Sequence, residues 1–168
     1  RGLPVLIRAW LPIADRWPSA KLWLIGDGPL RDSLYETIVD LGLRQQVLMP
    51  GSFDELSEVL HAADVFVSAA PDYGTTQALV EAMATGLPIV ACDTADIRGL
   101  IEDGIQGHLV AVGDRKQLSD RIAGLFEATE LALQYGLAAR RRANECFSLT
   151  RVVDEHLQLF QKLAASSL

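Results

Sequence analysis

The sequence predicts an α/β protein with a Rossmann-like parallel sheet that carries helices on both faces. Two observations support this prediction. Short apolar segments of strand length alternate with longer segments whose apolar residues recur at helical spacing. Glycine and proline stand at most of the junctions, where the chain has to turn. Strands and helices that alternate in this way favour parallel strands with a helix in each connection.

The composition of the 168-residue chain is that of one globular domain. Hydrophobic residues make up 49% of the sequence and charged residues 22%, so the chain is able to bury a proper core. Its net charge of −7 argues against nucleic-acid binding, because contacts to phosphates require a basic surface. A small basic pocket for a diphosphate remains compatible with that charge.

Cysteine use and hydropathy indicate the compartment. Cys92 and Cys146 do not make a disulfide framework, and we expect both to be buried thiols. The sequence shows no signal peptide and no apolar run long enough to span a bilayer, so a cytoplasmic location is expected. The chain also starts within a helical pattern and without an initiator methionine, as a fragment of a longer protein would.

Helices and strands are expected to alternate from the N-terminus onward. Apolar residues at helical spacing predict a first helix over residues 3–14. A Leu-Trp-Leu-Ile run predicts a strand over residues 21–25, and Pro29 then suits the first turn of the next helix. The following elements are expected to be a helix over 30–41, a strand over 46–49, a helix over 54–62 and a strand over 64–68.

The middle of the chain combines a loop, a helix, a sharp stop and a strand. The run Gly74–Thr76 makes a flexible start that is prone to capping, and helix formers fill residues 77–85. Gly86 suits the position after a helix, and Pro88 prevents its continuation. Residues 89–92 are therefore expected to form a short buried strand.

The last third of the chain is expected to be mainly helical. Residues 93–98 are polar, residues 100–102 are consistent with one helical turn, and Asp103 with Gly104 makes a turn. The remaining elements are expected to be a strand over 107–112 and helices over 114–126, 130–145 and 150–164.

The start of the helix over residues 77–85 is where the sequence indicates chemistry. Free N–H groups and the positive dipole end of a helix N-terminus favour an anion such as phosphate. Glu81 lies roughly two turns further along, at about 1.5 Å per residue. These groups could hold a phosphate and a sugar hydroxyl of one nucleotide. The alternative is an ordinary capped helix with a solvated glutamate.

This segment resembles the donor-binding signature of retaining GT-B glycosyltransferases, glycosyltransferase family 4. The family pattern is approximately E-G-[FT]-x-x-x-x-x-E-A-M-A-x-G-x-P-V. Tyr73 stands where the family has its first glutamate, which lies against the donor sugar. The residues that match in register are Gly74, Thr75, Glu81, Ala82, Met83, Ala84, Gly86 and Pro88.

Five further segments resemble motifs of the same family in the same order, so the resemblance covers nearly the whole chain. It implies the C-terminal, donor-binding half of a GT-B fold. The first strand of that half is then expected to be missing, so that neighbouring strands close up or another chain fills the gap. For residues 1–168 alone, exposed apolar surface is expected there. The five segments are Arg1–Trp10, Leu24–Pro29, Val47–Gly51, Ala63–Ser68 and Asp103–Gly107.

The resemblance also implies roles for individual residues. Glu81 would hold ribose hydroxyls, Arg1 would stabilise the diphosphate, and backbone groups near Pro50 would meet the base. Gly26 and Gly28 would form a wall of the donor cleft. No catalytic metal or cofactor is implied, because the sugar nucleotide is the substrate. The implied donor-binding set is Glu81, Tyr73, Gly74, Thr75, Thr76, Gly26, Gly28, Pro50 and Gly51.

Other kinds of site fit the sequence less well. The Gly26-x-Gly28 run lacks a third glycine, since Arg31 stands there, and Gln46 occupies the place of the expected acid, so a nicotinamide or flavin site is disfavoured. No metal-ligand spacing links the three histidines, which are His61, His108 and His156.

The expected function is transfer of a hexose-type sugar from a sugar nucleotide to a glycan or lipid acceptor by the full-length parent. Residues 1–168 would be its single nucleotide-sugar-binding domain. The partners would be the donor and an N-terminal acceptor domain of the same parent chain, so the isolated chain is expected to be inactive. The Arg140–Arg142 run could add peripheral contact with an acidic membrane, or it could be a solvated helix end.

Two alternatives remain open. The family's next motif, G-G-x-P-E, is here Ala95–Gly99, with both glycines and the acid replaced. This change and Tyr73 favour a non-catalytic GT-B-like binding or interaction domain. A sugar-nucleotide epimerase relative is the other alternative, and the E-A-M-A-x-G-x-P helix argues against it.

Overall fold

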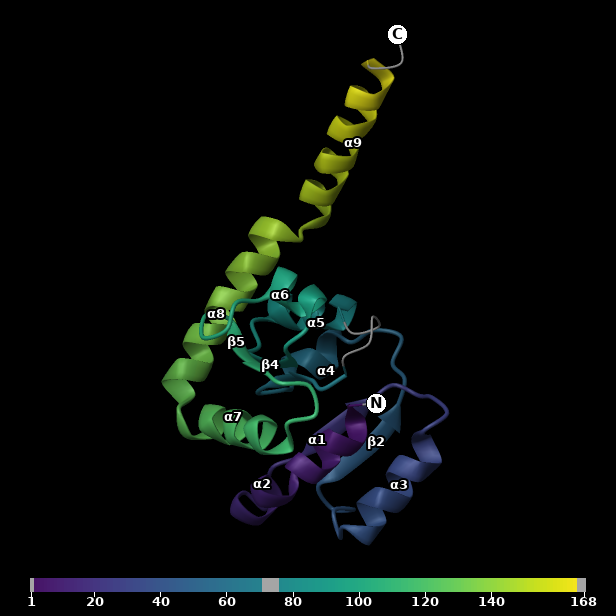
Figure 1. Cartoon of the computed structure of the whole chain (residues 1–168), viewed down its shortest axis with the longest axis vertical. Coiled ribbons are helices and arrows are strands. Elements are labelled where there is room, and N and C mark those ends of the chain that lie inside the picture. Colours follow the sequence, from purple (N-terminus) through teal and green to yellow (C-terminus); the bar gives the residue numbers. More distant parts are fainter. Residues whose placement is uncertain (1, 71–75, 166–168) are drawn as a thin grey trace.

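The computed structural model describes residues 2–70 and 76–165, in which helices alternate with short strands (Figure 1). Most of the expected elements are present, with small shifts at their ends. In chain order the elements are α1 (Leu3–Ala9), α2 (Leu11–Arg16), β1 (Leu22–Ile25), α3 (Arg31–Asp40), β2 (Val47–Gly51), α4 (Ser57–His61), β3 (Phe66–Ser68), α5 (Thr76–Thr85), β4 (Ile89–Cys92), α6 (Ala95–Leu100), β5 (Gly107–Val110), α7 (Arg115–Glu127), α8 (Thr129–Cys146) and α9 (Leu149–Ala165).

The described strands form two parallel sheets, where the sequence predicts one. β1 pairs with β2, and the second sheet has the order β3-β4-β5. The α/β class and the parallel direction of the strands are therefore confirmed. Among the described strands, β1 and β3 do not pair with each other, so the strands around the expected missing strand have not closed up.

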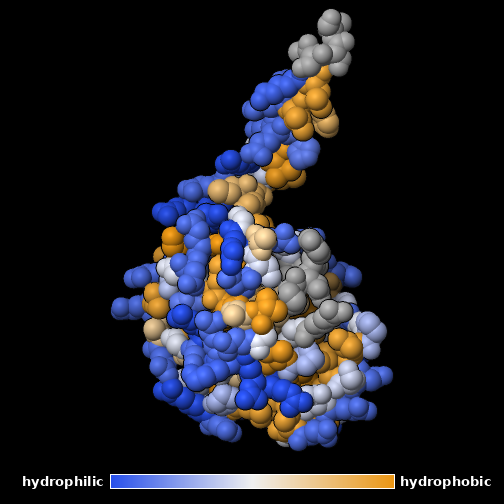
Figure 2. All heavy atoms as spheres, viewed as in Figure 1, coloured by the Kyte–Doolittle hydropathy of each residue, from blue (hydrophilic) through white to orange (hydrophobic). Residues whose placement is uncertain are grey.

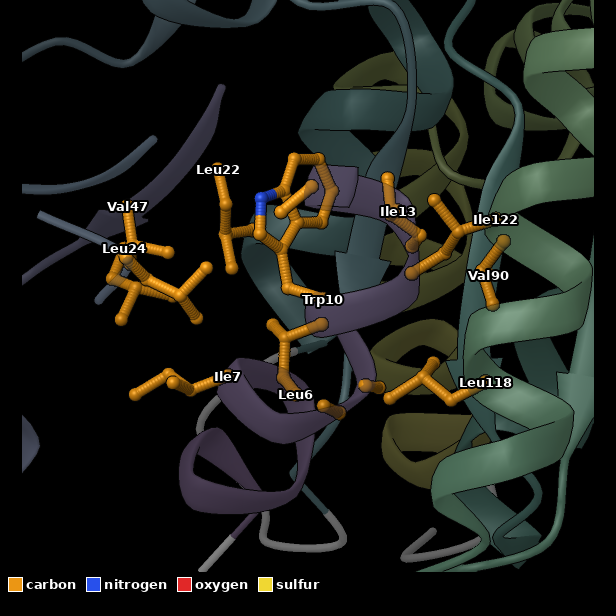
Figure 3. Close-up of a cluster of buried hydrophobic side chains, with 14 of the residues drawn as sticks. Leu6, Ile7, Trp10, Ile13, Leu22, Leu24, Val47, Val90, Leu118 and Ile122 are labelled. Carbon is orange, nitrogen blue, oxygen red and sulfur yellow. The ribbon is translucent and has the colours of Figure 1, made fainter. Parts of the chain in front are cut away.

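Side chains from helices join the two sheets into one hydrophobic core. Trp10 lies in the middle of this cluster, with Leu22 and Leu24 of β1 on one side and Val90 of β4 on the other (Figure 3). The Trp10 side chain is fully enclosed, at 3% exposed. Burial of these apolar groups is what holds the sheets together, since strand pairing does not connect them in the described part.

Helices cover both faces of the three-stranded sheet, as the sequence predicts. Val90 of β4 packs in the cluster that contains α1 and α7, whereas Ile89 and Ala91 pack in a second cluster with α5, α6 and α8. The two-stranded sheet differs because one of its faces is less well covered. The described structure leaves Trp23 and Leu48 on one of its faces 47% and 38% exposed.

The helix expected over residues 3–14 is two helices that meet at Trp10. Pro12 lies in the first turn of α2, where its missing N–H does not break a helical hydrogen bond. The single continuous helix of the sequence prediction is therefore wrong, because a proline cannot donate to the preceding turn.

A second correction concerns the segment after β4. Its polar residues form the helix α6, for which Thr94 is the N-cap and accepts a hydrogen bond from the Ile97 amide at 3.4 Å. The helical turn expected over residues 100–102 is wrong, because Ile101 has an extended backbone with φ −129° and ψ 155°.

Helix α9 extends away from the rest of the molecule (Figure 1). Leu149 and Phe160 on this helix are 78% and 60% exposed. Figure 2 shows apolar residues along one side of the helix and polar residues along the other. None of the helices in the described part of the chain has both the length and the apolar composition that crossing a bilayer requires.

Candidate functional site

Two glycine turns lie side by side where β1 and β2 end. The amide of Gly26 donates a hydrogen bond to the carbonyl of Gly51 at 2.9 Å. Both glycines have positive φ values, +115° and +95°, which residues with a Cβ rarely adopt. β2 runs through Pro50, beyond the strand expected over residues 46–49, and an edge strand tolerates its missing amide. The structure thus brings the Gly26 and Pro50–Gly51 segments together.

Asp27 and Arg31 fix the turn between β1 and α3. The Gly28 amide donates to Oδ1 of Asp27 at 2.8 Å, and Nη1 of Arg31 lies 3.8 Å from the same oxygen. Nη2 of Arg31 also donates to the Met49 carbonyl at 3.1 Å, which ties the turn to β2. A Cβ on Gly28 would meet no described atom within 4 Å. This turn is therefore held in place by polar contacts and is open at Gly28, whose role in a cleft wall stays a prediction.

Helix α5 has a buried apolar side and a polar side that carries Gln77 and Glu81. Leu79, Ala82 and Met83 are fully enclosed in the second core cluster. Gln77 and Glu81 lie one turn apart, and Nε2 of Gln77 donates a hydrogen bond to Oε1 of Glu81 at 2.9 Å. Glu81 is half-buried and Gln77 is exposed, so this pair faces away from the core.

Gly86 ends α5 in the way that the sequence predicts. Its φ is +85°, its amide donates to the Met83 carbonyl at 3.0 Å, and the Leu87 amide donates to the Ala82 carbonyl at 3.1 Å. Such bonds satisfy carbonyls at a helix C-terminus. They also set the direction in which the chain leaves α5 toward β4.

A cavity of about 700 Å³ lies between α5, α4 and the segment that follows β2. Its volume falls in the range of sites for small molecules and cofactors. The lining residues are Phe53, Asp54, Glu55, Leu56, Ser57, Leu60, Gln77, Ala78, Glu81, Ala84 and Thr85. Glu81, the carboxylate of the sequence prediction, is thus among the residues that line this open cavity.

The cavity combines an aromatic ring with several carboxylates. Phe53 is 41% exposed, so part of its side chain is accessible to a ligand. Asp54, Glu55 and Glu81 supply hydrogen-bond acceptors, and no described lining residue is a lysine, arginine or histidine. Because like charges repel, such a surface favours an uncharged group that bears hydroxyls or N–H groups over a phosphate.

Part of the predicted site lies outside the described residues. The residues of this undescribed part are Arg1, Tyr73, Gly74 and Thr75, and their roles remain predictions. Thr76 is the first residue of α5. The described helix therefore begins next to the segment in which the sequence places the anion site.

Two parts of the cavity were not identified from the sequence. Gln77 carried a usable signal, because it lies four residues before Glu81 and so shares its helix face. The segment over residues 53–57 carried none. Its place in the cavity depends on how the chain after β2 folds back onto α5, and that contact is not local.

An ion pair occupies the place of the family's glycine-rich motif, directly after β4. Nε and Nη2 of Arg98 donate to the two carboxylate oxygens of Asp93 at 2.5 Å and 2.8 Å. The hydrogen bond from Arg98 lowers the pKa of Asp93 below its usual range. A capped helix and an ion pair thus replace two glycines and an acid at this position.

The cysteines and His108 have structural surroundings. Cys92 is buried, its Sγ donates to the Ala69 carbonyl at 3.1 Å, and burial raises the pKa of its thiol. Cys146 is partly buried, less than the sequence predicts. His108 packs edge-on against Tyr135 with ring centroids 5.2 Å apart. Within the described ranges, no cluster of three or more His, Cys, Asp or Glu side chains is arranged to hold a metal ion.

These features define a class of protein. It is a Rossmann-like α/β domain whose cavity is lined by the segments that follow β2 and β3. Comparison with known sequences identifies a particular family within this class. The chain belongs to the glycosyl transferases group 1 family, whose sequence profile matches residues 1–128.

Several known proteins are similar over most of this chain. The chain is 29% identical over 159 residues to the lipopolysaccharide core biosynthesis glycosyltransferase LpsE of Rhizobium meliloti, covering 95% of this chain and 46% of LpsE. HepE of Anabaena, solved with UDP and glucose, has a TM-score of 0.81 and 28% identity over 95% of this chain and 44% of HepE. TarM of S. aureus, a variant solved with fondaparinux, alpha-GlcNAc-glycerol and UDP, has a TM-score of 0.86 and 25% identity over 93% of this chain and 32% of TarM. The chain therefore spans less than half the length of each of these relatives.

Proposed function

We propose that this chain is the donor-binding domain of a retaining glycosyltransferase that uses a nucleoside-diphosphate sugar. The observation that carries the proposal is the cavity beside Glu81, which joins a half-buried carboxylate to an exposed phenylalanine ring. In a member of the glycosyl transferases group 1 family, these groups suit a nucleoside. Phe53 can stack on the base, and Glu81 can accept a hydrogen bond from a ribose hydroxyl.

The charged part of the donor would lie outside the acidic cavity, at the start of α5. Amide groups at a helix N-terminus and the guanidinium of Arg1 are suited to a diphosphate. They would stabilise the negative charge that develops on the leaving nucleoside diphosphate. The protein would transfer a hexose-type sugar to a glycan or lipid acceptor bound by a second domain, in the cytoplasm and without a metal or cofactor.

Nucleotide binding tests this proposal, with Glu81→Ala as the diagnostic substitution. We expect isothermal titration of the longest natural form of the protein that contains this chain to detect binding of UDP, GDP or ADP. Loss of a hydrogen bond to a charged group should weaken that binding by about 10–100-fold in Glu81→Ala. Glu81 is on the polar side of α5, so the variant should fold normally.

Glu36→Ala is the matched control, because Glu36 is an exposed glutamate in the middle of another helix, α3. It makes the same change in charge and leaves the cavity unchanged, so its affinity should equal that of the unmodified protein. Failure of all three nucleotides to bind, or equal loss in the two variants, would contradict the proposal.

A second candidate function is a non-catalytic binding domain. The observation that favours it is α6, which occupies the place of the family's G-G-x-P-E motif and is fixed there by Thr94 and by the Asp93–Arg98 pair. Such a domain would bind nucleotide without transferring sugar. Release of UDP from UDP-GlcNAc, measured with and without acceptor glycans, separates the two candidates, and conversion of the sugar without acceptor would indicate an epimerase.

A further inference from the structure

Gln77 and Glu81 form a pair inside the candidate nucleotide cavity. Both side chains line the cavity, and Nε2 of Gln77 donates to Oε1 of Glu81 at 2.9 Å. The bond engages one carboxylate oxygen of Glu81. Oε2 therefore remains available to a ligand hydroxyl, and the second N–H and the carbonyl of Gln77 remain available as well.

The carboxylates around Glu81 are the reason why this hydrogen bond affects the orientation of its side chain. Asp54 and Glu55 line the same cavity, and no described lining residue is positively charged. Repulsion between carboxylates would favour orientations of Glu81 that point toward solvent. A neutral amide that donates to Glu81 counteracts this tendency without forming an ion pair, which would compete with the ligand for the carboxylate.

We propose that Gln77 is a positioning residue that orients Glu81 toward a ribose hydroxyl, so that the pair selects ribonucleotides over their deoxy counterparts. This inference rests on the proposed function. A carboxylate that is already oriented loses less conformational freedom when the ligand binds. Its hydrogen bond to a ligand hydroxyl therefore contributes more to the binding affinity.

The simpler interpretation is that the pair stabilises α5. A glutamine and a carboxylate four residues apart contribute about 0.2–0.5 kcal/mol to an isolated helix. That role would affect the melting temperature and would affect all ligands equally. A positioning role instead changes the preference between two ligands that differ by one hydroxyl, so the two interpretations can be separated.

The test compares UDP with 2′-deoxy-UDP and 3′-deoxy-UDP by isothermal titration, with GDP or ADP and their deoxy forms replacing them if the protein prefers another base. We expect the unmodified protein to bind the ribonucleotide about 10-fold more tightly than at least one deoxy form. Gln77→Leu keeps the helix propensity and removes the donor. The Gln77→Leu variant should bind the ribonucleotide about 3–10-fold more weakly than the unmodified protein does. Its binding of that deoxy form should weaken by less than half of this factor.

A double substitution shows whether Gln77 acts through Glu81. In a Glu81→Ala background, Gln77→Leu should cause no further loss, because the carboxylate that it orients is gone. Gln134→Leu, an exposed glutamine on α8, is the matched control and should leave the preference unchanged. Gln77→Met serves as a second variant if Gln77→Leu alters the melting temperature.

The possible results separate this inference from the proposed function. Absence of binding by any nucleoside diphosphate overturns both. Binding with an unchanged hydroxyl preference in Gln77→Leu overturns the inference and leaves the proposed function in place. Equal loss for ribo and deoxy forms, or a further loss in the Glu81→Ala background, also overturns it, because Gln77 would then act on another part of the ligand.

Discussion

Gly136 controls how closely helix α8 approaches the end of α5. A Cβ atom on Gly136 would lie 2.0 Å from the carbonyl oxygen of Gly86, far inside any normal contact distance. Gly86 cannot move aside easily, because its positive φ and its hydrogen bond to Met83 end the helix. One missing methyl group thus sets the position of the helix that carries Glu81.

Gly136→Ala should destabilise the protein. Forcing a methyl group into this contact displaces backbone against backbone, at a cost of about 3 kcal/mol. For a chain of this size we expect the melting temperature to fall by about 6–12 °C. Thermal denaturation followed by circular dichroism measures this shift.

Gly124→Ala is the control, because it is the same kind of substitution with the opposite expected effect on stability. Gly124 lies inside α7, and a Cβ there would meet no described atom within 4 Å. Alanine is the better helix former, so this variant should be more stable by about 0.5–1 kcal/mol. If the two substitutions changed stability by the same amount, the close approach of α8 to Gly86 would not matter.

At the element scale, α7 depends on two hydrogen bonds from backbone amides to side chains at its start. Oδ1 of Asp114 accepts from the Gln117 amide at 2.9 Å, and Oε1 of Gln117 accepts from the Ala111 amide at 2.7 Å. These bonds satisfy backbone donors before and within the first turn. They also join the last strand to the helix whose Leu118 and Ile122 pack in the main core.

Asp114→Ala should lower the free energy of unfolding by about 1 kcal/mol, because it removes the acceptor at the N-cap. Asp114→Asn separates the cap from the charge. Asparagine caps helices about as well as aspartate, so this variant should retain most of the stability. Chemical denaturation with urea gives both values, and equal losses in the two variants would show that the negative charge at the helix start is what stabilises α7.

The sequence predicted α5 well and α6 poorly, for reasons that lie in the elements themselves. α5 has a clear stop at Gly86 and three buried residues on one side, so local patterns specify it. α6 has six residues, includes the poor helix former Gly99, and is fixed partly by contacts from elsewhere. Nε of Arg142 on α8 donates to the Leu100 carbonyl at 2.6 Å, and no local pattern reveals that bond.

The same distinction applies to the candidate site. The helical position of Glu81 and the glycine turns after β1 and at the end of β2 could be predicted, because each belongs to a short motif with a local physical reason. The cavity itself could not. Phe53 and Leu56 reach it because the chain after β2 returns across α5, and such a return depends on the packing of the whole domain.

At the scale of the whole molecule, the two sheets share a core, but no described strand pairing connects them. Within the described strands, the edges of β1 and β3 that are not used by β2 and β4 have no strand partner. Two buried polar atoms, Nε1 of Trp10 and Oγ of Ser68, also have no hydrogen-bond partner in the described structure. Unpaired groups of this kind are costly in a protein interior.

The entry of the chain into α1 indicates which segment could use these edges. A Cβ on Gly2 would lie 1.7 Å from the Ala69 carbonyl oxygen, so Gly2 lies directly against the residue that follows β3. A strand placed immediately before Arg1 would therefore end at the carboxyl edge beside β3. Running toward that edge, it would be parallel to β3, as the other described strand pairs are.

We expect an apolar, β-branched extension of about six residues before Arg1 to insert between β1 and β3. Several new cross-strand contacts should add about 2 kcal/mol of stability, which corresponds to a rise of about 4–8 °C in the melting temperature. Hydrogen exchange should show greater protection of the amides over residues 66–68. A Gly-Ser extension of equal length is the control, since it cannot form a stable strand. Equal protection and equal melting temperatures for the two extensions would mean that the gap does not accept a strand and that the core side chains already close it.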